Sequence, residues 1–331
     1  MHLVYHMSYL QAIVIGIIQG IGELFPISSL GHTVLIPEWF GGSWAKLVSQ
    51  ESLPESPYLA FVVGLHLATA LVLLGFYIRE WARIARGFVR TLVRRRIETE
   101  AERLAWLIIV ATIPVGILGL VFEHQFRVLF AKPLAAAFFL TVNGLILLAG
   151  EAFRRRNLRL AAATGEVSAA PSSPTTVATD DRPASKVRFR DDAIVSMDAG
   201  AEHELAEIGW LSSGLIGAAQ ALALLAGISR EGIAMAGGLF RGLNNENALR
   251  FSFLLSTPVI FAAGILKVGD LTGPLGAGIR GPVLAGALAA AGSSLFAIVF
   301  LSRYFKTRTL IPFAVYCLVF GGVSMIHFGI F

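Results

Sequence analysis

Six long apolar runs alternate with polar segments along this 331-residue chain. Each reaches or approaches the roughly 18 to 20 residues that a helix needs to cross a bilayer. They lie at about residues 58–78, 104–122, 133–150, 250–267, 281–301 and 309–330. Away from their ends the runs contain no Asp, Glu, Lys or Arg, and their only imidazoles are His66 and His327. The pattern predicts an all-α integral membrane protein with six transmembrane helices.

The composition agrees with a membrane location. Hydrophobic residues make up 55% of the chain and charged residues 15%, whereas a soluble domain has about 25% charged residues. Basic residues gather between the runs: eight arginines from Arg79 to Arg103, four from Arg154 to Arg159, and Arg303, Lys306 and Arg308. The positive-inside rule places these three loops in the cytoplasm and both termini outside. The arginines lack interleaved stacking aromatics, so no nucleic-acid partner is expected.

A polar segment divides the chain into two halves. Residues 161–205 are rich in Ala, Ser, Thr, Pro and Asp and poor in large apolar side chains. Such a segment cannot bury enough surface to offset the entropy of ordering. We expect a flexible cytoplasmic linker between a first repeat, residues 1–160, and a second repeat, residues 206–331.

Two segments, 201 residues apart, resemble each other. Ile15–His32 is IGIIQGIGELFPISSLGH, and Ile216–Ile233 is IGAAQALALLAGISREGI. The pairs Ile15/Ile216, Gly16/Gly217, Gln19/Gln220, Leu24/Leu225, Ile27/Ile228, Ser28/Ser229 and Gly31/Gly232 are identical. Broken apolar segments at matching places in two halves are typical of a central binding site in a membrane protein.

These segments are too short or too broken to be ordinary spans. Tyr9–Gly22 precedes Glu23 after only 14 residues, and we expect Pro26 and Gly31 to interrupt the helix. The pattern predicts re-entrant hairpins at about residues 9–37 and 208–243. They would enter from opposite faces of the membrane, as in an inverted-topology repeat. Irregular backbone at membrane depth must be buried in protein or line a wet cavity, and two opposed hairpins would supply such a cavity.

The first turn carries candidate catalytic groups. Gln19 and Glu23 share one helix face, where their oxygens suit Mg²⁺ or Ca²⁺. Ser28 and Ser29 offer hydroxyls, one of which could be a nucleophile, and His32 offers a base or acid. Structural alternatives stay open: the serines could be helix caps, and His32 a hydrogen-bonded structural imidazole.

The second turn carries candidate phosphate-binding groups. Arg230 presents a planar fork for two phosphate oxygens, and backbone N–H groups near Ser229 and Gly232 favour anions. Gln19 and Gln220 could instead bond to each other across the hairpins. His66 and Asn143 are interpreted as buried polar contacts, and the single cysteine, Cys317, as a small apolar residue.

These motifs resemble a known family. Gln19–His32, QGIGELFPISSLGH, is similar to the E-G-x-x-E-x-x-P-x-S-S-x-G-H motif of the bacterial undecaprenyl-diphosphate phosphatases, the bacitracin-resistance type. Ala226–Gly232, AGISREG, and Phe251–Pro258, FSFLLSTP, resemble that family's P-G-x-S-R-S-G and F-S-F-L-L-x-x-P motifs. Ile311–Tyr316, IPFAVY, resembles its last-span motif.

The resemblance implies an enzyme that converts undecaprenyl diphosphate to the monophosphate and inorganic phosphate, recycling the lipid carrier of cell-wall synthesis. It implies six spans with two re-entrant hairpins, a divalent cation, and a site facing the periplasmic side of the cell membrane. By motif position, Glu23 would serve the metal or acid–base chemistry, Ser29 would be the nucleophile, and His32 an acid–base group or alternative nucleophile. Arg230 would bind the diphosphate, with Ser28, Ser229 and Gly232 beside it. A second copy of the chain is a candidate partner.

The chain departs from the family pattern at four positions. Gln19 stands for the first glutamate, Ala226 for a proline, Glu231 for a serine and Ala234 for a threonine. We hypothesise that Glu231 replaces the missing carboxylate across the hairpin interface and is a second metal ligand. Alternatively, Glu231 weakens diphosphate binding by Arg230. The second function class is a lipid-phosphate transporter or flippase, because opposed hairpins also occur in transporters.

Overall fold

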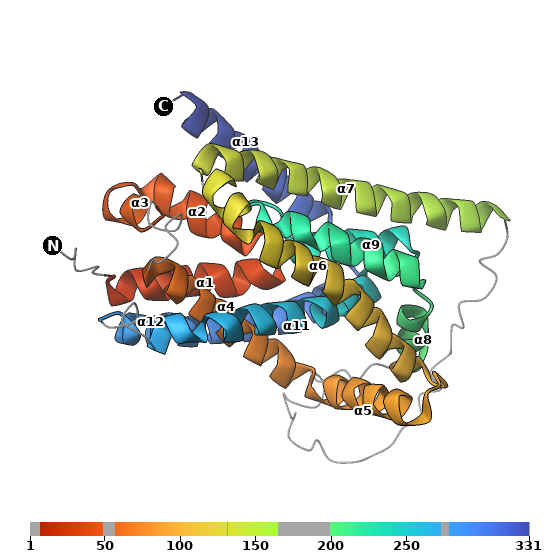
Figure 1. Ribbon diagram of the computed structural model, residues 1–331. Helices are drawn as coiled ribbons and strands as arrows, with labels where there is room; N and C mark the ends of the chain where they lie inside the picture. The colour runs from red at the N-terminus through yellow and green to blue at the C-terminus, as the bar shows by residue number, and fades with distance from the viewer. Residues whose placement is uncertain (1–6, 49–56, 131, 165–198, 273–277, 331) are drawn as a thin grey trace, which may run out of the picture.

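A computed structural model describes residues 7–48, 57–130, 132–164, 199–272 and 278–330 of the chain. In these ranges the elements are α-helices and one 3-10 helix (Figure 1). Their bounds are α1 (Tyr9–Leu24), α2 (Ser29–Phe40), α3 (Gly42–Val48), α4 (Pro57–Phe76), α5 (Ile78–Arg94), α6 (Glu100–Phe130), α7 (Pro133–Thr164), α8 (Ala199–Ala206), α9 (Trp210–Gln220), η1 (Ala221–Leu224), α10 (Arg230–Phe240), α11 (Asn245–Thr272), α12 (Arg280–Tyr304) and α13 (Ile311–Ile330). The expectation of an all-α membrane protein is confirmed.

Five helices are long and apolar enough to cross a membrane by themselves. They are α6, α7, α11, α12 and α13, and α4 supplies a sixth candidate span together with α5. Several run beyond the apolar lengths that the sequence predicted, because their polar ends remain helical: α6 continues to Phe130 and α7 to Thr164. Asn244 accepts a hydrogen bond from the Asn247 N–H at 2.8 Å, so it caps the start of α11.

Two loop predictions differ from the structure. The arginine-rich segment after the first span is a helix, α5, bent by 81° from α4. The predicted linker, 161–205, lies mostly outside the described residues, and its described ends belong to α7 and α8. Gly31, expected to break the first hairpin, lies inside α2, because the break falls instead between Leu24 and Ser29.

The helices of the two halves pack in matching pairs. α4 packs against α11, and α7 packs against α13; α1 contacts α12 as α9 contacts α6. Two glycines of the repeated segments allow the last two contacts. A Cβ at Gly16 would overlap the Gly286 carbonyl, and one at Gly217 would overlap the backbone of Ala111. The identical glycines at matched positions therefore allow equivalent close contacts, between α1 and α12 in one case and between α9 and α6 in the other.

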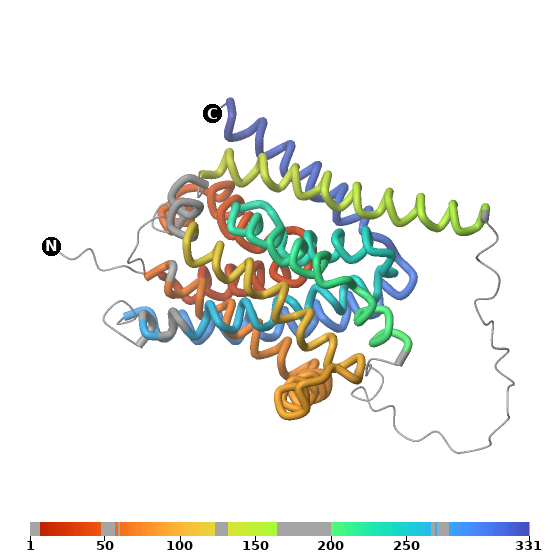
Figure 2. Tube along the Cα trace, turned by 45° about the vertical axis from the view of Figure 1, so that its right-hand side comes forward, coloured from red at the N-terminus to blue at the C-terminus, as the bar shows by residue number. Residues whose placement is uncertain are grey.

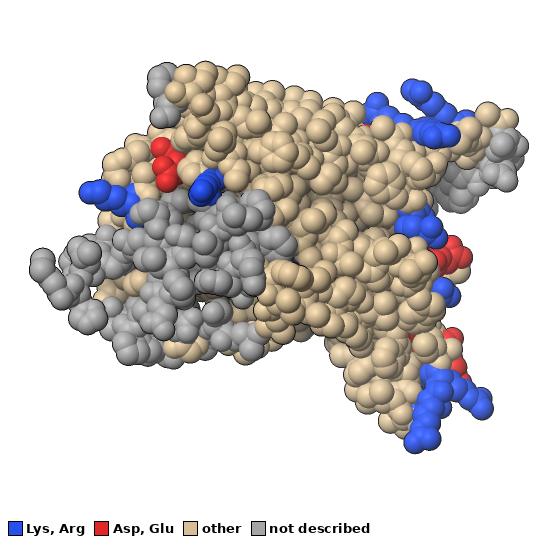
Figure 3. Space-filling model, turned by 45° about the horizontal axis from the view of Figure 1, so that its top comes forward, with Lys and Arg blue, Asp and Glu red and all other residues tan. Residues whose placement is uncertain are grey.

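The two broken segments approach each other from opposite ends of the helix bundle. In Figure 1, α1 and α2 occupy the left-hand side and α9 enters from the right, where α8 lies; Figure 2 shows the same arrangement from a second direction. Most of the Lys and Arg atoms visible in Figure 3 lie at the right-hand end, near α5 and the end of α7, and a few lie at the left-hand end. The middle of the face seen in Figure 3 carries almost no charged atoms, as expected of a surface in contact with lipid.

Candidate functional site

The turns of the two segments touch directly. Ser28 Oγ accepts hydrogen bonds from the N–H groups of Gly31, in its own turn, and of Gly227, in the other, both at 3.2 Å. A Cβ at Gly31 would lie 2.8 Å from the Gly227 Cα, so only glycine fits there. Ser28 (φ 71°) and Gly227 (φ 110°) both adopt positive φ, a conformation that is costly for serine and cheap for glycine. The serine is held there by its two hydrogen bonds.

Ser28 and Ser229 have the same local role. Each caps the helix that follows its turn, since Ser229 Oγ accepts a hydrogen bond from the Gly232 N–H at 3.1 Å, as Ser28 Oγ does from Gly31. The capping alternative was left open for Ser28 and Ser29; it describes the geometry of Ser28, whereas the Ser29 hydroxyl donates to Glu23. Each hydroxyl acts as acceptor in these bonds and keeps its own O–H for another partner.

Asn143, in the first half of α7, joins the two turns. Its Nδ2 donates to the Pro26 carbonyl at 2.9 Å, and its Oδ1 accepts from the Ser229 N–H at 3.0 Å. The side chain is fully buried, so each bond satisfies a backbone group that water cannot reach. The sequence identified Asn143 only as a buried polar contact. The structure shows that it holds two segments 203 residues apart (229 − 26) in one place.

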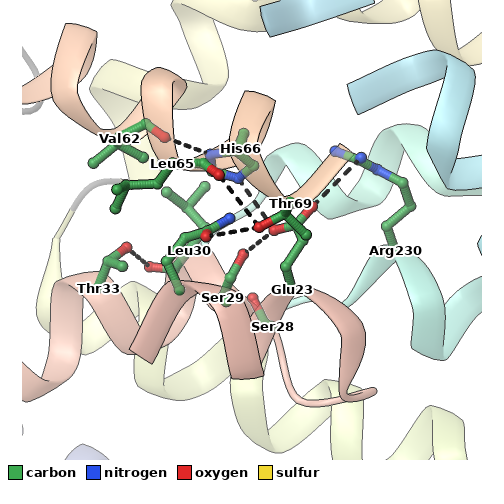
Figure 4. A network of polar contacts seen from close by, with 12 residues as sticks. Glu23, Ser28, Ser29, Leu30, Thr33, Val62, Leu65, His66, Thr69 and Arg230 are labelled. Carbon is green, nitrogen blue, oxygen red and sulfur yellow. Dashed lines mark hydrogen bonds and ion pairs between the residues drawn. The ribbon is translucent and has the colours of Figure 1, made fainter. Parts of the chain in front are cut away.

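Glu23 is the centre of a buried polar cluster at the end of α1 (Figure 4). The Ser29 hydroxyl donates a short hydrogen bond to Glu23 Oε2, and His66 Nε2, from α4, lies 3.1 Å from the same oxygen. Arg230, the first residue of α10, places Nη1 3.7 Å from Glu23 Oε1. Residues from both halves thus meet at one carboxylate, which is 4% exposed.

The hydrogen bonds of His66 define its protonation. Its Nδ1 lies 2.8 Å from the Val62 carbonyl, which can only accept a hydrogen bond, so this nitrogen carries a proton. Its Nε2 faces a carboxylate oxygen, which also accepts. One further proton must therefore lie between His66 and Glu23, and the two side chains form a charge-assisted pair.

The structure places His32 apart from this cluster. Its Nδ1 bonds to the Ser28 carbonyl at 2.7 Å, and its Nε2 to the Tyr316 hydroxyl of α13 at 2.8 Å. The ring also stacks on those of Tyr316 and Phe320. Both ring nitrogens therefore form hydrogen bonds with groups other than Ser29. This geometry is that of a hydrogen-bonded structural imidazole, the alternative left open for His32.

Several buried polar atoms around the cluster have no hydrogen-bond partner among the described residues. They include Nε and Nη1 of Arg230, Oε1 of Glu231, Nε2 of Gln19 and both polar atoms of the Gln220 side chain. Gln19 Oε1 accepts from Thr69 at 3.1 Å, so a bond between Gln19 and Gln220 does not form. Of these, Arg230 lies beside Glu23, and an unpartnered buried donor at this position is expected where a polar ligand completes the site.

The residues fit a hard cation only in part. Among the described residues no group of three or more His, Cys, Asp or Glu side chains could hold a metal ion. Glu23 and Glu231 offer carboxylate oxygens, and Glu231 is 2% exposed, with one oxygen that has no hydrogen-bond partner within the described ranges. Mg²⁺ is typically held by one or two carboxylates together with substrate phosphates, so these oxygens suit a cation that arrives with a diphosphate.

The sequence located part of this arrangement. Glu23, Ser29 and Arg230 were predicted site residues, and the structure brings them together. His66 was interpreted as a buried polar contact, yet it bonds directly to Glu23. The clue was its position: it is an imidazole in the middle of a span, where ionisable side chains are costly and usually functional.

Comparisons with known proteins agree with one another. The profile of a protein family described as "Bacitracin resistance protein BacA" matches residues 12–323. "Undecaprenyl-diphosphatase 2" of Frankia alni is 54% identical and covers 98% of this chain and 99% of its own. The "Undecaprenyl-diphosphatase" of Mycolicibacterium paratuberculosis is 50% identical over 97% of both chains, and "Undecaprenyl-diphosphatase 2" of Chromobacterium violaceum is 36% identical over 97% of this chain and 99% of its own.

Proposed function

Because this chain belongs to the family of the bacitracin resistance protein BacA, we propose that it hydrolyses undecaprenyl diphosphate to the monophosphate and inorganic phosphate. The observation that carries the proposal is the cluster in which Ser29 and Arg230, from opposite halves, contact Glu23. A nucleophile bonded to a base, beside a guanidinium with unused N–H groups, suits attack on a phosphoric anhydride. The transporter alternative has no comparable support, since the relatives are named diphosphatases.

The first step uses the hydrogen bond between Ser29 and Glu23. The Ser29 oxygen attacks the terminal phosphorus while Glu23 accepts the hydroxyl proton. The bond from this phosphorus to the bridging oxygen breaks, and undecaprenyl phosphate leaves with the electron pair. Glu23 passes its proton to an oxygen of the departing phosphate and becomes a carboxylate again. Water then attacks the phosphoserine while Glu23 accepts a proton from the water. The bond from phosphorus to the Ser29 oxygen breaks, inorganic phosphate leaves, and Glu23 returns the proton to the Ser29 oxygen. The proton shared by His66 and Glu23 keeps the carboxylate oriented.

Arg230 is the proposed diphosphate-binding residue. Its Nε and Nη1 are buried without hydrogen-bond partners in the part of the chain that the structure describes, so they can donate to phosphate oxygens without breaking a hydrogen bond to any of its residues. Arg230 also begins α10, whose first N–H groups favour an anion. Ser28, Ser229 and Gly232 keep this helix start and its neighbour in position.

A divalent cation, Mg²⁺ or Ca²⁺, belongs to the proposal as the group that neutralises the diphosphate and makes its terminal phosphorus more electrophilic. Glu23 and Glu231 would hold it, with Gln19 as a weaker candidate, because Gln19 Oε1 already accepts a hydrogen bond from Thr69. In this arrangement the Glu231 carboxylate stands in for the glutamate that Gln19 replaces.

We also propose the finer topology. The matched helix pairs and the identical glycines at their contacts support an inverted-topology repeat, with α1–α2 and α9–α10 as re-entrant hairpins. The gathering of Lys and Arg at one end supports a cytoplasmic location for that end, by the positive-inside rule. The opposite end, from which α1 and α2 enter, would then face outside and admit the lipid headgroup.

The test is phosphate release from a polyprenyl diphosphate by purified protein with Mg²⁺ or Ca²⁺. Ser29→Ala and Arg230→Ala should each reduce kcat at least a hundredfold, because each removes a group used in the transition state. Ser252→Ala is a matched control, since that buried hydroxyl donates to the Leu249 carbonyl of its own helix. Absence of release by the unaltered protein would refute the function; full activity of Ser29→Ala would refute the nucleophile.

A further inference from the structure

Helix α5 has a continuous apolar stripe that faces away from the protein. Ile78, Ala82, Ala85, Val89 and Val93 recur every three or four positions, the spacing of one helix face. Ile78 is 54% exposed, Val89 57% and Val93 78%. Such values resemble those of residues on the spans, such as Ile113 of α6 at 53%. The stripe is therefore as apolar and as open as a lipid-facing surface.

α5 cannot itself cross a bilayer. It has 17 residues and carries five arginines, and it is bent by 81° from α4, the apolar helix that precedes it. A helix of this length is about 25 Å long. Since α4 has 20 residues of apolar sequence, about the length that crosses a bilayer, a bend of this size directs α5 along the plane of the membrane rather than across it.

The opposite face of α5 fixes the direction of the stripe. Thr91 Oγ1 accepts a hydrogen bond from the Trp106 indole of α6 at 3.0 Å, and Gly87 packs closely on the backbone of Glu102. Arg83 forms a 2.7 Å ion pair with Glu202 of α8. Contacts to two helices on this side prevent the apolar stripe from rotating inward.

The arginines of α5 lie beside the stripe. A groove of about 440 Å³ is lined by Ala85, Arg86, Val89, Arg90, Val93 and Arg94, so guanidinium groups border apolar side chains along its length. Arg90 and Arg94 pair with Glu98, whereas Arg79 and Arg86 form no ion pair with another described residue. Figure 3 shows Lys and Arg atoms projecting at this end of the molecule. Free positive charge beside an apolar stripe matches the headgroup and acyl region of an anionic lipid leaflet.

We propose that α5 is an interfacial helix that inserts its apolar stripe into the bilayer at the arginine-rich end of the protein and binds anionic phospholipid headgroups through Arg79 and Arg86. None of its residues belongs to the Glu23 cluster, so the proposal stands apart from the hydrolytic function. An anionic phospholipid fits both parts of this surface. Its phosphate can bind the guanidinium groups, and its acyl chains can cover Val89 and Val93.

The first experiment measures the depth of the stripe. In a Cys317→Ala background, spin labels are attached to Val93→Cys on the stripe, to Ile113→Cys on a span and to Arg96→Cys after the end of α5. Accessibility to oxygen and to a water-soluble nickel chelate is then measured in liposomes that contain phosphatidylglycerol. The Val93 label should resemble the Ile113 label and favour oxygen. If it matches the Arg96 label, α5 lies in water and the proposal is wrong.

The second experiment measures headgroup selectivity. Native mass spectrometry gives the affinity of the purified protein for phosphatidylglycerol and for phosphatidylcholine. Arg79→Ala/Arg86→Ala should weaken phosphatidylglycerol binding by roughly fivefold per arginine, the factor that corresponds to ~1 kcal/mol per basic residue. Arg156→Ala/Arg159→Ala removes the same charge from the end of α7 and should leave this site intact. Equal losses in both variants, or equal affinity for the two lipids, would overturn the proposal.

Discussion

Asn143→Ala tests the claim that the two turns form one site. In the native protein the Asn143 amide satisfies the Pro26 carbonyl and the Ser229 N–H, at 2.9 and 3.0 Å. The substitution leaves both backbone groups buried without a partner, and each orphaned group costs about 1–3 kcal/mol. The expected loss is therefore about 2–6 kcal/mol, a large part of the ~5–15 kcal/mol by which folded proteins are usually stable.

The assay combines stability with activity. Detergent-solubilised protein is heated, and the folded fraction is measured by size-exclusion chromatography; the midpoint should fall by several degrees. Thr141→Val is the control on the same helix, because Thr141 Oγ1 donates to the Ala137 carbonyl of that helix. Activity at a temperature where Asn143→Ala remains folded should also fall, because Arg230 would no longer be held at Glu23. A midpoint and an activity equal to those of Thr141→Val would refute the bridging role.

Three further predictions concern the cluster and its scaffold. His66→Gln should reduce kcat roughly 10- to 100-fold, because it removes a charge-assisted hydrogen bond worth about 1.5–3 kcal/mol from Glu23, and an unchanged kcat would exclude this role. Glu231→Gln should weaken Mn²⁺ binding, measured by electron paramagnetic resonance, about tenfold or more; unaltered binding would remove Glu231 from the cation site. Gly217→Ala should lower the thermal midpoint far more than Gly214→Ala on the same helix, since only the first overlaps neighbouring backbone, and equal effects would contradict the close packing of α9.

The repeated motif located both turns because its identical residues have local tasks. Gly16 and Gly217 permit close helix contacts, and Ser28 and Ser229 cap helices. Such tasks depend on the residue type and its immediate neighbours, so they leave a pattern that a sequence can show. The apolar runs located the spans for the same reason.

Other features depend on partners that are distant in sequence. Nothing near His66 indicates that α4 packs where its imidazole meets Glu23, and nothing near His32 indicates that Tyr316 of α13 takes its second nitrogen. The sequence thus predicted a catalytic role for His32 and a structural one for His66, whereas the structure places His66 at the carboxylate. The periodic apolar residues of α5 were visible, but its density of arginines favoured a loop.

The proposed cation site would account for two of the four departures from the family pattern, Gln19 and Glu231, through a balance of charge. Glu23 and Glu231 are both almost fully buried, and Arg230 lies beside Glu23, while His66 shares one proton with it. When both carboxylates are ionised, their two negative charges equal the two positive charges of Arg230 and an imidazolium at His66. This balance matters because buried charges are costly unless they are paired. A diphosphate brings at least two further negative charges into this site. In the proposed site, Gln19 removes one negative charge and Glu231 would restore it on the other hairpin, so the proposed need for a positive ion to accompany the substrate would be unchanged.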